Sequence, residues 1–443
     1  MDMKKLVATA LVGGLIVSGV NVSVDFSAAQ AKKQENFDNG KVKNVIFMIP
    51  DGYGATYATN YRWFKGEESS FDAHVKGLVK TYSANTEVTD SAAAGTAMAT
   101  GVKTDNGMVG VTPDGEEVDS ILDAAEENKK ATGLVATSTI THATPAVFGA
   151  SVASRGEEAA IAPQYFDNDV DVILGGGRQY FLSSEEGGKQ PEGNLIEGAQ
   201  QDGYNYVTDR DALLANKDGK LLGLFAQDAM SPEMHRGETE EPSLSEMTEA
   251  AIGALKQDKD GFFLMVEGSQ IDWAGHAHDA AWAMNDLKAF DEAVAAAIEF
   301  AKKDGNTLVV VAGDHETGGM SVGANGVYDV KTEVLHNVTA TGDVMASELS
   351  ESRDNVEEVV KAYTGLELSE DEIKRIVEAK EPAVAINEVV SDRALIGWTT
   401  TAHTGTDVPL YAYGPQADTF SGVIENTDIP KKMAKAMKID LNN

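Results

Sequence analysis

The chain has 443 residues, a length that large α/β domains with insertions reach, and its 42% of apolar and 24% of charged residues are ordinary for a soluble globular protein. Its formal net charge of −35 excludes nucleic acids and anionic membranes as expected partners, because their phosphate groups would repel it. Cysteine is absent, which excludes disulfides and thiolate ligands, so any zinc must be bound by histidine and carboxylate side chains.

The N-terminus has the pattern of a secretory signal peptide. Lys4 and Lys5 precede a long apolar run, and Ala29-Gln30-Ala31 matches a small-residue cleavage site. We therefore expect a signal peptide over residues 1–31 and a polar linker over 32–40, with the mature protein in the extracellular space or the periplasm. The sequence has no later apolar stretch long enough to span a bilayer, so no membrane partner is expected.

Short apolar runs alternate with helical patterns between residues 42 and 319. The runs are NVIFMIP, GLVATSTI, DVILGGG, FFLMV and TLVVVAG. Such runs are typical of buried parallel strands, and they predict a three-layer α/β sandwich with a central, mostly parallel sheet flanked by helices. Helices are expected at 90–101, 118–130, 243–257 and 278–303. The Gly- and Glu-rich segment 183–242 is predicted to form surface loops with a few short elements.

The pattern changes after about residue 320 to acidic amphipathic helices. These are expected at 356–364 and 369–379, and the second begins with a capping box. Strands resume near TTTAHTG. The mature chain beyond the linker is therefore divided into an α/β core (41–320), an inserted cap or crown (321–393) and a return to the core (394–443).

Polar side chains follow the ends of the five apolar runs. They are, in chain order, Asp51, His142, Thr144, Arg178, Glu267, Asp314 and His315. Because ligands bind beyond the carboxyl ends of strands in open α/β sheets, we expect these distant residues to meet at one place. Most of them are hard oxygen or imidazole donors, so a metal site is predicted there.

One motif has the spacing of zinc ligands. In VEGSQIDWAGHA, His276 lies four residues after Asp272, so one helical turn places both on one face. A surface Asp–His pair is the alternative. His278 has the wrong spacing to join Asp272 and is expected to take no part. For Asp314 and His315 in GDHETGG, the alternative is a helix cap beside a solvated histidine.

His403, Ser91 and Arg155 are candidates that are weaker in isolation. His403 lies in a Thr- and Gly-rich loop. Ser91, in TDSAAAGTA, is expected in the first turn of a helix, where backbone N–H groups favour an anion. Metal activation is the simplest route to a nucleophile there, and a mere N-cap is the alternative. Arg155 suits two oxygens of a phosphoryl group, and a surface arginine is the alternative.

Together these motifs resemble one known family. IPDGYG, TDSAAAGTAMATG, THATPA, SRG, VEGSQIDWAGHA, GDHETGG and AHTG occur in order between residues 44 and 413, and they are similar to motifs of the secreted bacterial alkaline phosphatases. The resemblance implies a metal-dependent phosphomonoesterase of broad specificity with a phosphoserine intermediate. It also implies two zinc ions, one magnesium ion and a homodimer.

The resemblance assigns a role to each matching residue. Ser91 is the implied nucleophile, Arg155 binds the phosphate, and Asp90 orients Arg155. The implied ligands are Asp272, His276 and His403 for the first zinc, Asp51, Asp314 and His315 for the second, and Asp51, Thr144 and Glu267 for the third ion.

Two positions differ from part of this family. Some members have an acid where this chain has His142 and a lysine where it has Trp273, while other members have the same pair as this chain. His142 is expected near the third ion, whose identity is therefore open among magnesium, zinc and cobalt. Trp273 cannot attract phosphate as a lysine does, so product phosphate should bind less tightly.

Other function classes receive less support from the sequence. A sulfatase needs a modifiable residue in a C/S-x-P-x-R context, whereas three alanines follow Ser91. A phosphodiesterase of the same superfamily is the main alternative, and an exported protein that binds phosphate or metal without turnover is another. The acidic residues are spread along the chain, and adaptation to a salty habitat is a hypothesis that would explain them.

Overall fold

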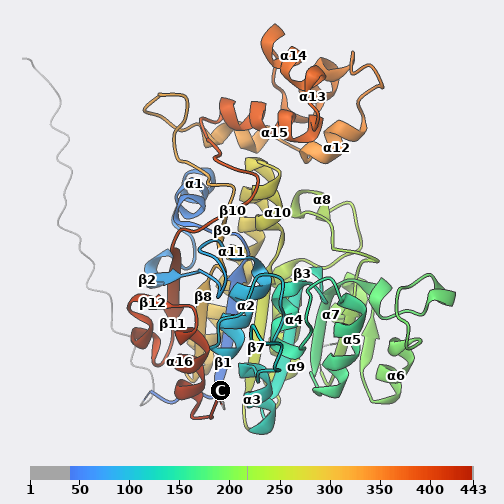
Figure 1. Cartoon of the computed structure of the whole chain (residues 1–443), viewed down its shortest axis with the longest axis vertical. Coiled ribbons are helices and arrows are strands. Elements are labelled where there is room, and N and C mark those ends of the chain that lie inside the picture. Colours follow the sequence, from blue (N-terminus) through green and yellow to red (C-terminus); the bar gives the residue numbers. More distant parts are fainter. Residues whose placement is uncertain (1–39, 217, 442–443) are drawn as a thin grey trace, which may run out of the picture. The chain divides into compact units, whose positions relative to one another are not determined.

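A ten-stranded sheet runs through the described part of the chain, in the order β12-β2-β11-β8-β1-β7-β3-β4-β6-β5 (Figure 1). The computed structural model describes residues 40–216 and 218–441, which belong to one compact unit. The strands of this sheet are β1 (Asn44–Pro50), β2 (Val75–Lys80), β3 (Ala131–Thr139), β4 (Val172–Gly176), β5 (Asn205–Val207), β6 (Leu221–Leu224), β7 (Phe262–Gly268), β8 (Thr307–Ala312), β11 (Val408–Tyr413) and β12 (Gly422–Glu425). A second, two-stranded sheet pairs β9 (Glu316–Thr317) with β10 (His403–Thr404). The expected signal peptide and all but the last residue of the linker lie outside the described residues.

The five apolar runs form the centre of the large sheet. β8, β1, β7, β3 and β4 are parallel neighbours, as predicted. Ile49 of β1 is level with Glu267 of β7, and Met48 is level with Val311 of β8, so these strands end at the same edge. β11 is antiparallel to β8 and β2.

The α-helices of the described residues include those on both faces of this sheet and those of a separate group described below. They are α1 (Ala55–Lys65), α2 (Ser91–Thr100), α3 (Ile121–Glu127), α4 (Ala143–Gly149), α5 (Glu158–Asp167), α6 (Leu195–Gln201), α7 (Arg210–Ala215), α8 (Glu233–Arg236), α9 (Leu244–Leu255), α10 (Gln270–His276), α11 (Ala280–Asp304), α12 (Gly342–Ser347), α13 (Val356–Thr364), α14 (Glu370–Glu378), α15 (Pro382–Arg393) and α16 (Asp428–Met437). Short 3₁₀ helices are η1 (Asp72–His74), η2 (Arg178–Tyr180), η3 (Ser184–Glu186), η4 (Thr332–Asn337) and η5 (Ala417–Phe420).

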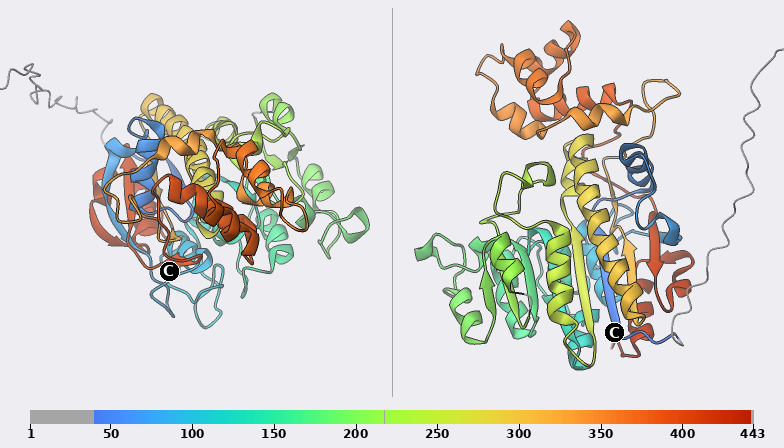
Figure 2. Two further views of the ribbon diagram at one scale, coloured as in Figure 1. Left: turned by 90° about the horizontal axis from the view of Figure 1, so that it is seen from above. Right: turned by 180° about the vertical axis from the view of Figure 1, so that it is seen from behind.

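The side chains of β1 alternate between two apolar cores, as the period of a strand requires. Val45, Phe47 and Ile49 pack in the core that includes α2, α3, α4 and α16. Ile46 and Met48 pack in the other core, with α9 and α11. Figure 1 shows the first group of helices on one side of the sheet, and the right-hand view of Figure 2 shows α9 and α11 on the opposite side. The predicted three-layer sandwich is confirmed.

The segment 183–242 is more regular than its composition predicted. Besides loops and short helices, it contributes β5 and β6 to one edge of the sheet. The reason is the apolar run Leu221–Leu224, all of whose residues are buried. Glycines and acids flank this run, so the average composition of the segment is that of a loop and does not indicate the strand.

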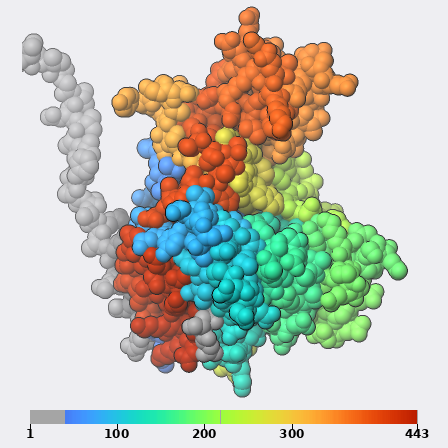
Figure 3. Space-filling view, viewed as in Figure 1, coloured from blue at the N-terminus to red at the C-terminus, as the bar shows by residue number. Residues whose placement is uncertain are grey.

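Helices α12–α15, called the crown here, form a separate group (Figure 3). They share an apolar core of their own, and α15 also contacts α11 and η4. The predicted helix at 356–364 is α13, and the predicted capping box of Ser369 and Glu372 begins α14. Among the described residues, none of the helices is both long and apolar enough to cross a bilayer.

Candidate active site

The ends of three adjacent strands bring distant acids together. Asp51 follows β1, Glu267 lies near the end of β7, and Asp314 lies two residues beyond β8. Because β1 lies between β7 and β8, all three side chains reach the same edge of the sheet. All three are fully buried. Burial of unpaired carboxylates is costly, which makes this edge a candidate functional site.

A first group of potential metal ligands consists of Asp272, His276 and His403. Asp272 and His276 lie one turn apart on α10, as predicted, and His403 comes from β10. Nε2 of His276 is 3.3 Å from Asp272 Oδ2, and Nε2 of His403 is 3.4 Å from Asp272 Oδ1. The two Nε2 atoms are 3.1 Å apart, so both rings converge on one point beside the carboxylate.

The backbone orients both rings of this first group. Nδ1 of His276 donates to the carbonyl of Thr401 at 2.6 Å, and Nδ1 of His403 donates to the carbonyl of Thr89 at 2.8 Å. A carbonyl only accepts, so each Nδ1 carries a proton and Nε2 is the nitrogen of each ring that is directed at the common point. Neutral imidazoles held in this way are the usual form of histidine ligands.

A second group consists of Asp51, Asp314 and His315. Nε2 of His315 lies 3.1 Å from Asp314 Oδ2 and 3.4 Å from Asp51 Oδ1. The hydroxyl of Ser91 is also 3.1 Å from this nitrogen. The ring of His315 stacks on that of His403, with centroids 3.6 Å apart, so the first two groups are adjacent.

A third group consists of Asp51, His142 and Glu267. Asp51 therefore belongs to two groups, and its Oδ2 accepts a hydrogen bond from Thr144 Oγ1 at 3.4 Å. Thr144 lies in the first turn of α4, just beyond β3, where the sequence predicted a donor. The structure thus brings all four of these residues together.

Asp90, and not Ser91, caps the helix that carries the candidate nucleophile. The Asp90 side chain accepts from the backbone N–H of Ala93 at 3.0 Å, and Ser91 is the first residue of α2. The alternative that Ser91 only caps the helix is therefore wrong. Its hydroxyl points instead to His315, at the positive end of the helix dipole.

Arg155 lies beside this helix end. One of its terminal nitrogens is 3.0 Å from Asp90 Oδ2, and the other is 3.1 Å from His142 Nε2. The ring of His142 meets Trp273 edge to face, with centroids 5.9 Å apart. Arg155 is thus held at two points, with its side chain 29% exposed, which contradicts the alternative of an ordinary surface arginine.

Burial and mutual repulsion shift the pKa values of these groups. Burial, followed by the charge of Asp314, raises the pKa of Asp51 well above its ordinary value. Burial raises the pKa of Glu267 to about 7. Burial acts upward on Asp272 too, but hydrogen bonds from the neighbouring histidines outweigh it and lower its pKa. Burial and then the charge of Arg155 lower the pKa of His142 to about 4.

Four buried polar atoms of these residues have no hydrogen-bond partner among the described residues. They are Asp51 Oδ1, His142 Nδ1, Glu267 Oε1 and Asp314 Oδ2. Native proteins rarely leave buried polar atoms unpaired, and a divalent cation would offset both their desolvation and their repulsion. With oxygen and imidazole donors and no thiolate, the residues present fit zinc and magnesium.

Comparisons with known proteins show the family of this chain. The family model described as alkaline phosphatase matches residues 42–439. Alkaline phosphatase 3 of Bacillus subtilis is 44% identical, over 99% of this chain and 98% of the relative. The chain belongs to the alkaline phosphatase family.

Two solved structures are similar to this alkaline phosphatase fold. The cold-active enzyme from a psychrophilic Shewanella has a TM-score of 0.82 and 34% identity, covering 89% of this chain and 99% of its own. A histidine-to-aspartate mutant of the TAB5 alkaline phosphatase, with Mg bound in the M3 site, has a TM-score of 0.69 and 33% identity, covering 90% and 99% of the two chains.

Alkaline phosphatases are phosphomonoester hydrolases, so the predicted activity class is confirmed. The phosphodiesterase alternative is not favoured, since the family model and the named relatives are all alkaline phosphatases.

One predicted residue does not reach the candidate site. Arg178 follows β4 in η2, and its Nε donates to Gln227 at 3.2 Å. β4 lies two strands away from β7, and the chain turns at Gly177 with a φ of +88°, so Arg178 is directed elsewhere. The prediction that the residues after all five apolar runs meet at one place was therefore wrong for Arg178.

Thr317 is a site residue that the sequence did not indicate by itself. Its hydroxyl donates to Asp272 and lies 3.3 Å from His315 Nδ1, so it joins the first two ligand groups. Its place in GDHETGG, two residues after His315 in β9, is the only local signal. The side-chain contact to Asp272 spans 45 residues and depends on the fold.

Proposed function

We propose that the chain hydrolyses phosphate monoesters by transferring the phosphoryl group first to Ser91 and then to water. The observation that carries this proposal is the position of Ser91 Oγ, 3.1 Å from His315 Nε2 in the first turn of α2. This serine is buried beside two groups of metal-ligand type. Such surroundings suit activation of a hydroxyl that lacks a general base close in sequence.

The proposed metal content is two zinc ions and one magnesium ion, with zinc or cobalt as alternatives for the third. The proposed ligands are Asp272, His276 and His403 for the first zinc, Asp51, Asp314 and His315 for the second, and Asp51, Thr144 and Glu267 for the third ion. When bound, zinc would supply Lewis-acid stabilisation of the oxygens at phosphorus and lower the pKa of a hydroxyl group. The unpaired buried oxygens of Asp51, Asp314 and Glu267 support this assignment.

In the first step, Ser91 Oγ attacks phosphorus in line with the leaving oxygen. The bond from phosphorus to Oγ forms, the bond to the alcohol oxygen breaks, and the alcohol leaves with a proton. In the second step, water attacks the phosphoserine, the bond to Oγ breaks, and phosphate leaves. Each step inverts phosphorus, so the net result is retention.

Arg155 would bind two phosphoryl oxygens during both steps. Asp90 and His142 hold its two terminal nitrogens at 3.0 and 3.1 Å, which limits the rotation of the guanidinium. The positive end of the α2 dipole, where Ser91 lies, would also favour this anion. These groups all address the phosphoryl group, so we propose broad specificity for the alcohol.

A trapping experiment tests this proposal. The enzyme is mixed with p-nitrophenyl phosphate, quenched in acid and digested, and the peptide that contains Ser91 is analysed by mass spectrometry. We expect one phosphoryl group on Ser91 and a much higher rate on the monoester than on bis(p-nitrophenyl) phosphate. A label on another residue, or faster diester hydrolysis, would reject the proposal. Metal content per chain is measured on the same sample.

We also propose that residues 1–31 are removed during secretion and that residues 321–393 form an inserted domain between two parts of the core. The signal peptide lies outside the described residues and rests on its sequence pattern. The separate apolar core of the crown supports the insertion. N-terminal sequencing of exported protein should begin near Lys32, whereas an uncleaved N-terminus would contradict the first part.

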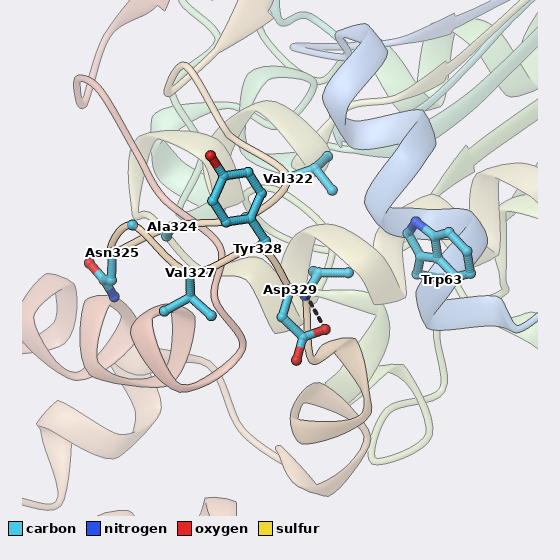
Figure 4. Close-up of a pocket in the computed structure, with 10 residues that line it drawn as sticks. Trp63, Val322, Ala324, Asn325, Val327, Tyr328 and Asp329 are labelled. Carbon is cyan, nitrogen blue, oxygen red and sulfur yellow. Dashed lines mark hydrogen bonds between the residues drawn. The ribbon is translucent and has the colours of Figure 1, made fainter. Parts of the chain in front are cut away.

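A surface pocket supports a proposed homodimer. It has a volume of about 760 Å³ and lies between α1 and the loop 322–330 (Figure 4). Trp63 and Tyr328 at this pocket are 63% and 106% exposed, and Val327 is 49% exposed. Exposed apolar side chains gathered in this way are typical of contact surfaces.

The homodimer is tested by light scattering after size-exclusion chromatography. The parent should elute at twice the mass of one chain, and Trp63→Ser with Tyr328→Ser should shift it towards the monomer. Tyr82→Ser, at another exposed aromatic residue, is the matched control. A parent that elutes as a monomer would exclude the dimer, and a dimer that survives the double substitution would exclude this surface.

A further inference from the structure

His278 lies in the link between α10 and α11, two residues after His276. Its side chain is buried, and its φ is +53°, a conformation that residues other than glycine rarely adopt. Two residues of α15 hold the link itself. Ser391 Oγ donates to the carbonyl of His278 at 3.1 Å, and Asn387 donates to that of Ala277 at 2.9 Å. The surrounding structure thus maintains an unfavourable backbone at this point.

Both ring nitrogens of His278 have partners from distant parts of the chain. Nε2 donates to the carbonyl of Thr400 at 2.8 Å, and Nδ1 is 3.0 Å from Glu388 Oε1 in α15. The ring also stacks on Trp398, with centroids 5.1 Å apart and planes at 6°. Glu388 is in turn paired with Arg375 of α14. The imidazole therefore joins the crown to the segment 398–400.

This segment leads directly to two proposed ligands of the first zinc. Thr401 follows Thr400, and its carbonyl accepts from Nδ1 of His276 at 2.6 Å. His403 follows two residues later, with Nε2 3.1 Å from that of His276. A shift at Thr400 would therefore change the direction of both imidazoles, whose lone pairs must converge on one ion.

We propose that His278 is a positioning residue for the first zinc site. By holding Thr400 and Trp398, it keeps the segment 398–403 in the register that aims His276 and His403 at one ion, and Glu388 extends this support to the crown. His278 is not a member of that ligand group, in agreement with its spacing from Asp272. This inference rests on the proposed zinc sites and adds a residue that the sequence led us to expect as a bystander.

Two substitutions separate positioning from simple packing. In His278→Asn the amide nitrogen replaces Nδ1, so the contact with Glu388 can remain and the donor to Thr400 is lost. In His278→Gln the longer side chain brings its amide nitrogen near the place of Nε2, so the donor to Thr400 can remain. Asparagine tolerates a positive φ better than glutamine. Packing and backbone effects alone would therefore make His278→Asn the more stable of the two variants.

The measurement is zinc per chain against time in a chelator, with the melting temperature recorded for each variant. We expect His278→Asn to lose one of its two zinc ions about tenfold faster than the parent, while the other is lost at the parental rate. His278→Gln should stay within about twofold of the parent, although its melting temperature is the lower of the two. Glu388→Ala removes the support from the crown, and this variant should lose the same ion about threefold faster than the parent. It tests the proposal independently if His278→Asn does not fold.

The proposal would be overturned if His278→Asn and Glu388→Ala lost zinc at the same rate as the parent. Zinc loss that follows the melting temperatures of all the variants, or that affects both ions equally, would also overturn it, because either result indicates a general loss of stability. Failure of the proposed function has a different signature. In that case the parent itself holds fewer than two zinc ions or forms no phosphoserine.

Discussion

The hydroxyl of Ser91 lies 3.1 Å from Nε2 of His315, although 224 residues separate them in the sequence. This contact places a serine at the edge of the second ligand group, together with Asp51 and Asp314. Asp90 takes the capping role that Ser91 would otherwise have, which leaves the serine side chain free for chemistry. The nucleophile, its helix and its proposed metal site are thus parts of one arrangement.

Replacing Ser91 by alanine should abolish turnover. We expect kcat on a phosphate monoester to fall by at least about 10³-fold, because the covalent intermediate can no longer form. Zinc content should stay near that of the parent, since the other proposed ligands are intact. Ser245→Ala, at a serine on α9 away from the site, serves as the control. Activity that survives in Ser91→Ala would mean that another group is the nucleophile.

Replacing Arg155 by alanine should mainly weaken phosphate binding. A charge-assisted hydrogen bond contributes about 1.5–3 kcal/mol, which corresponds to a rise of roughly 10- to 150-fold in KM and in the inhibition constant of inorganic phosphate. Steady-state kinetics with phosphate as inhibitor measure both. Arg178→Ala is the matched control, since that side chain bonds to Gln227. Equal effects of the two substitutions would contradict the assigned role of Arg155.

Replacing His142 by aspartate should increase the dependence on magnesium. His142 shares a potential metal site with Asp51 and Glu267, and a third carboxylate would favour a hard cation over zinc. We expect activity to rise severalfold as magnesium is added to the metal-depleted variant, and to rise less when it is added to the metal-depleted parent. His336→Asp, in η4, controls for the added charge. Identical magnesium titrations for His142→Asp and the parent would contradict this prediction.

Asp286 should make stability depend on pH. Burial, followed by repulsion from Glu233, raises the pKa of this α11 residue to about 7. A carboxyl group whose pKa is raised in the folded state stabilises the folded protein only at low pH. This contribution is complete below the pKa of about 4 that the group has in the unfolded chain, and it is lost as the pH rises through about 7. Asparagine cannot ionise, so Asp286→Asn should lose less stability over this range.

The melting temperature of Asp286→Asn, relative to the parent, should therefore increase by about 2 °C or more between pH 5.5 and 8.5. Differential scanning calorimetry of the metal-loaded proteins measures this difference. Asp343→Asn, at an exposed acid of the crown, is the control. If the difference in melting temperature between Asp286→Asn and the parent stayed constant with pH, the raised pKa assigned to Asp286 would be refuted.

Much of the fold was predictable because its signals are local. The five apolar runs became five parallel strands, since runs of this length between turn residues are stable when both faces of a sheet are covered. The four-residue spacing of Asp272 and His276 fixed their common face on α10. The strand at Leu221–Leu224 was not predictable from composition, because its flanking residues are typical of loops.

The sequence by itself determined the strands, the helix faces and the chemical types of the donors, because these follow from spacings of a few residues. Only the tertiary structure decided which donors meet. It directed Arg178 away from the site, brought Thr317 to Asp272, and placed His278 between the crown and the segment that carries His403. The physical reason is that hydrogen bonds between residues 45 to 122 positions apart depend on sheet order and packing, which no local spacing encodes.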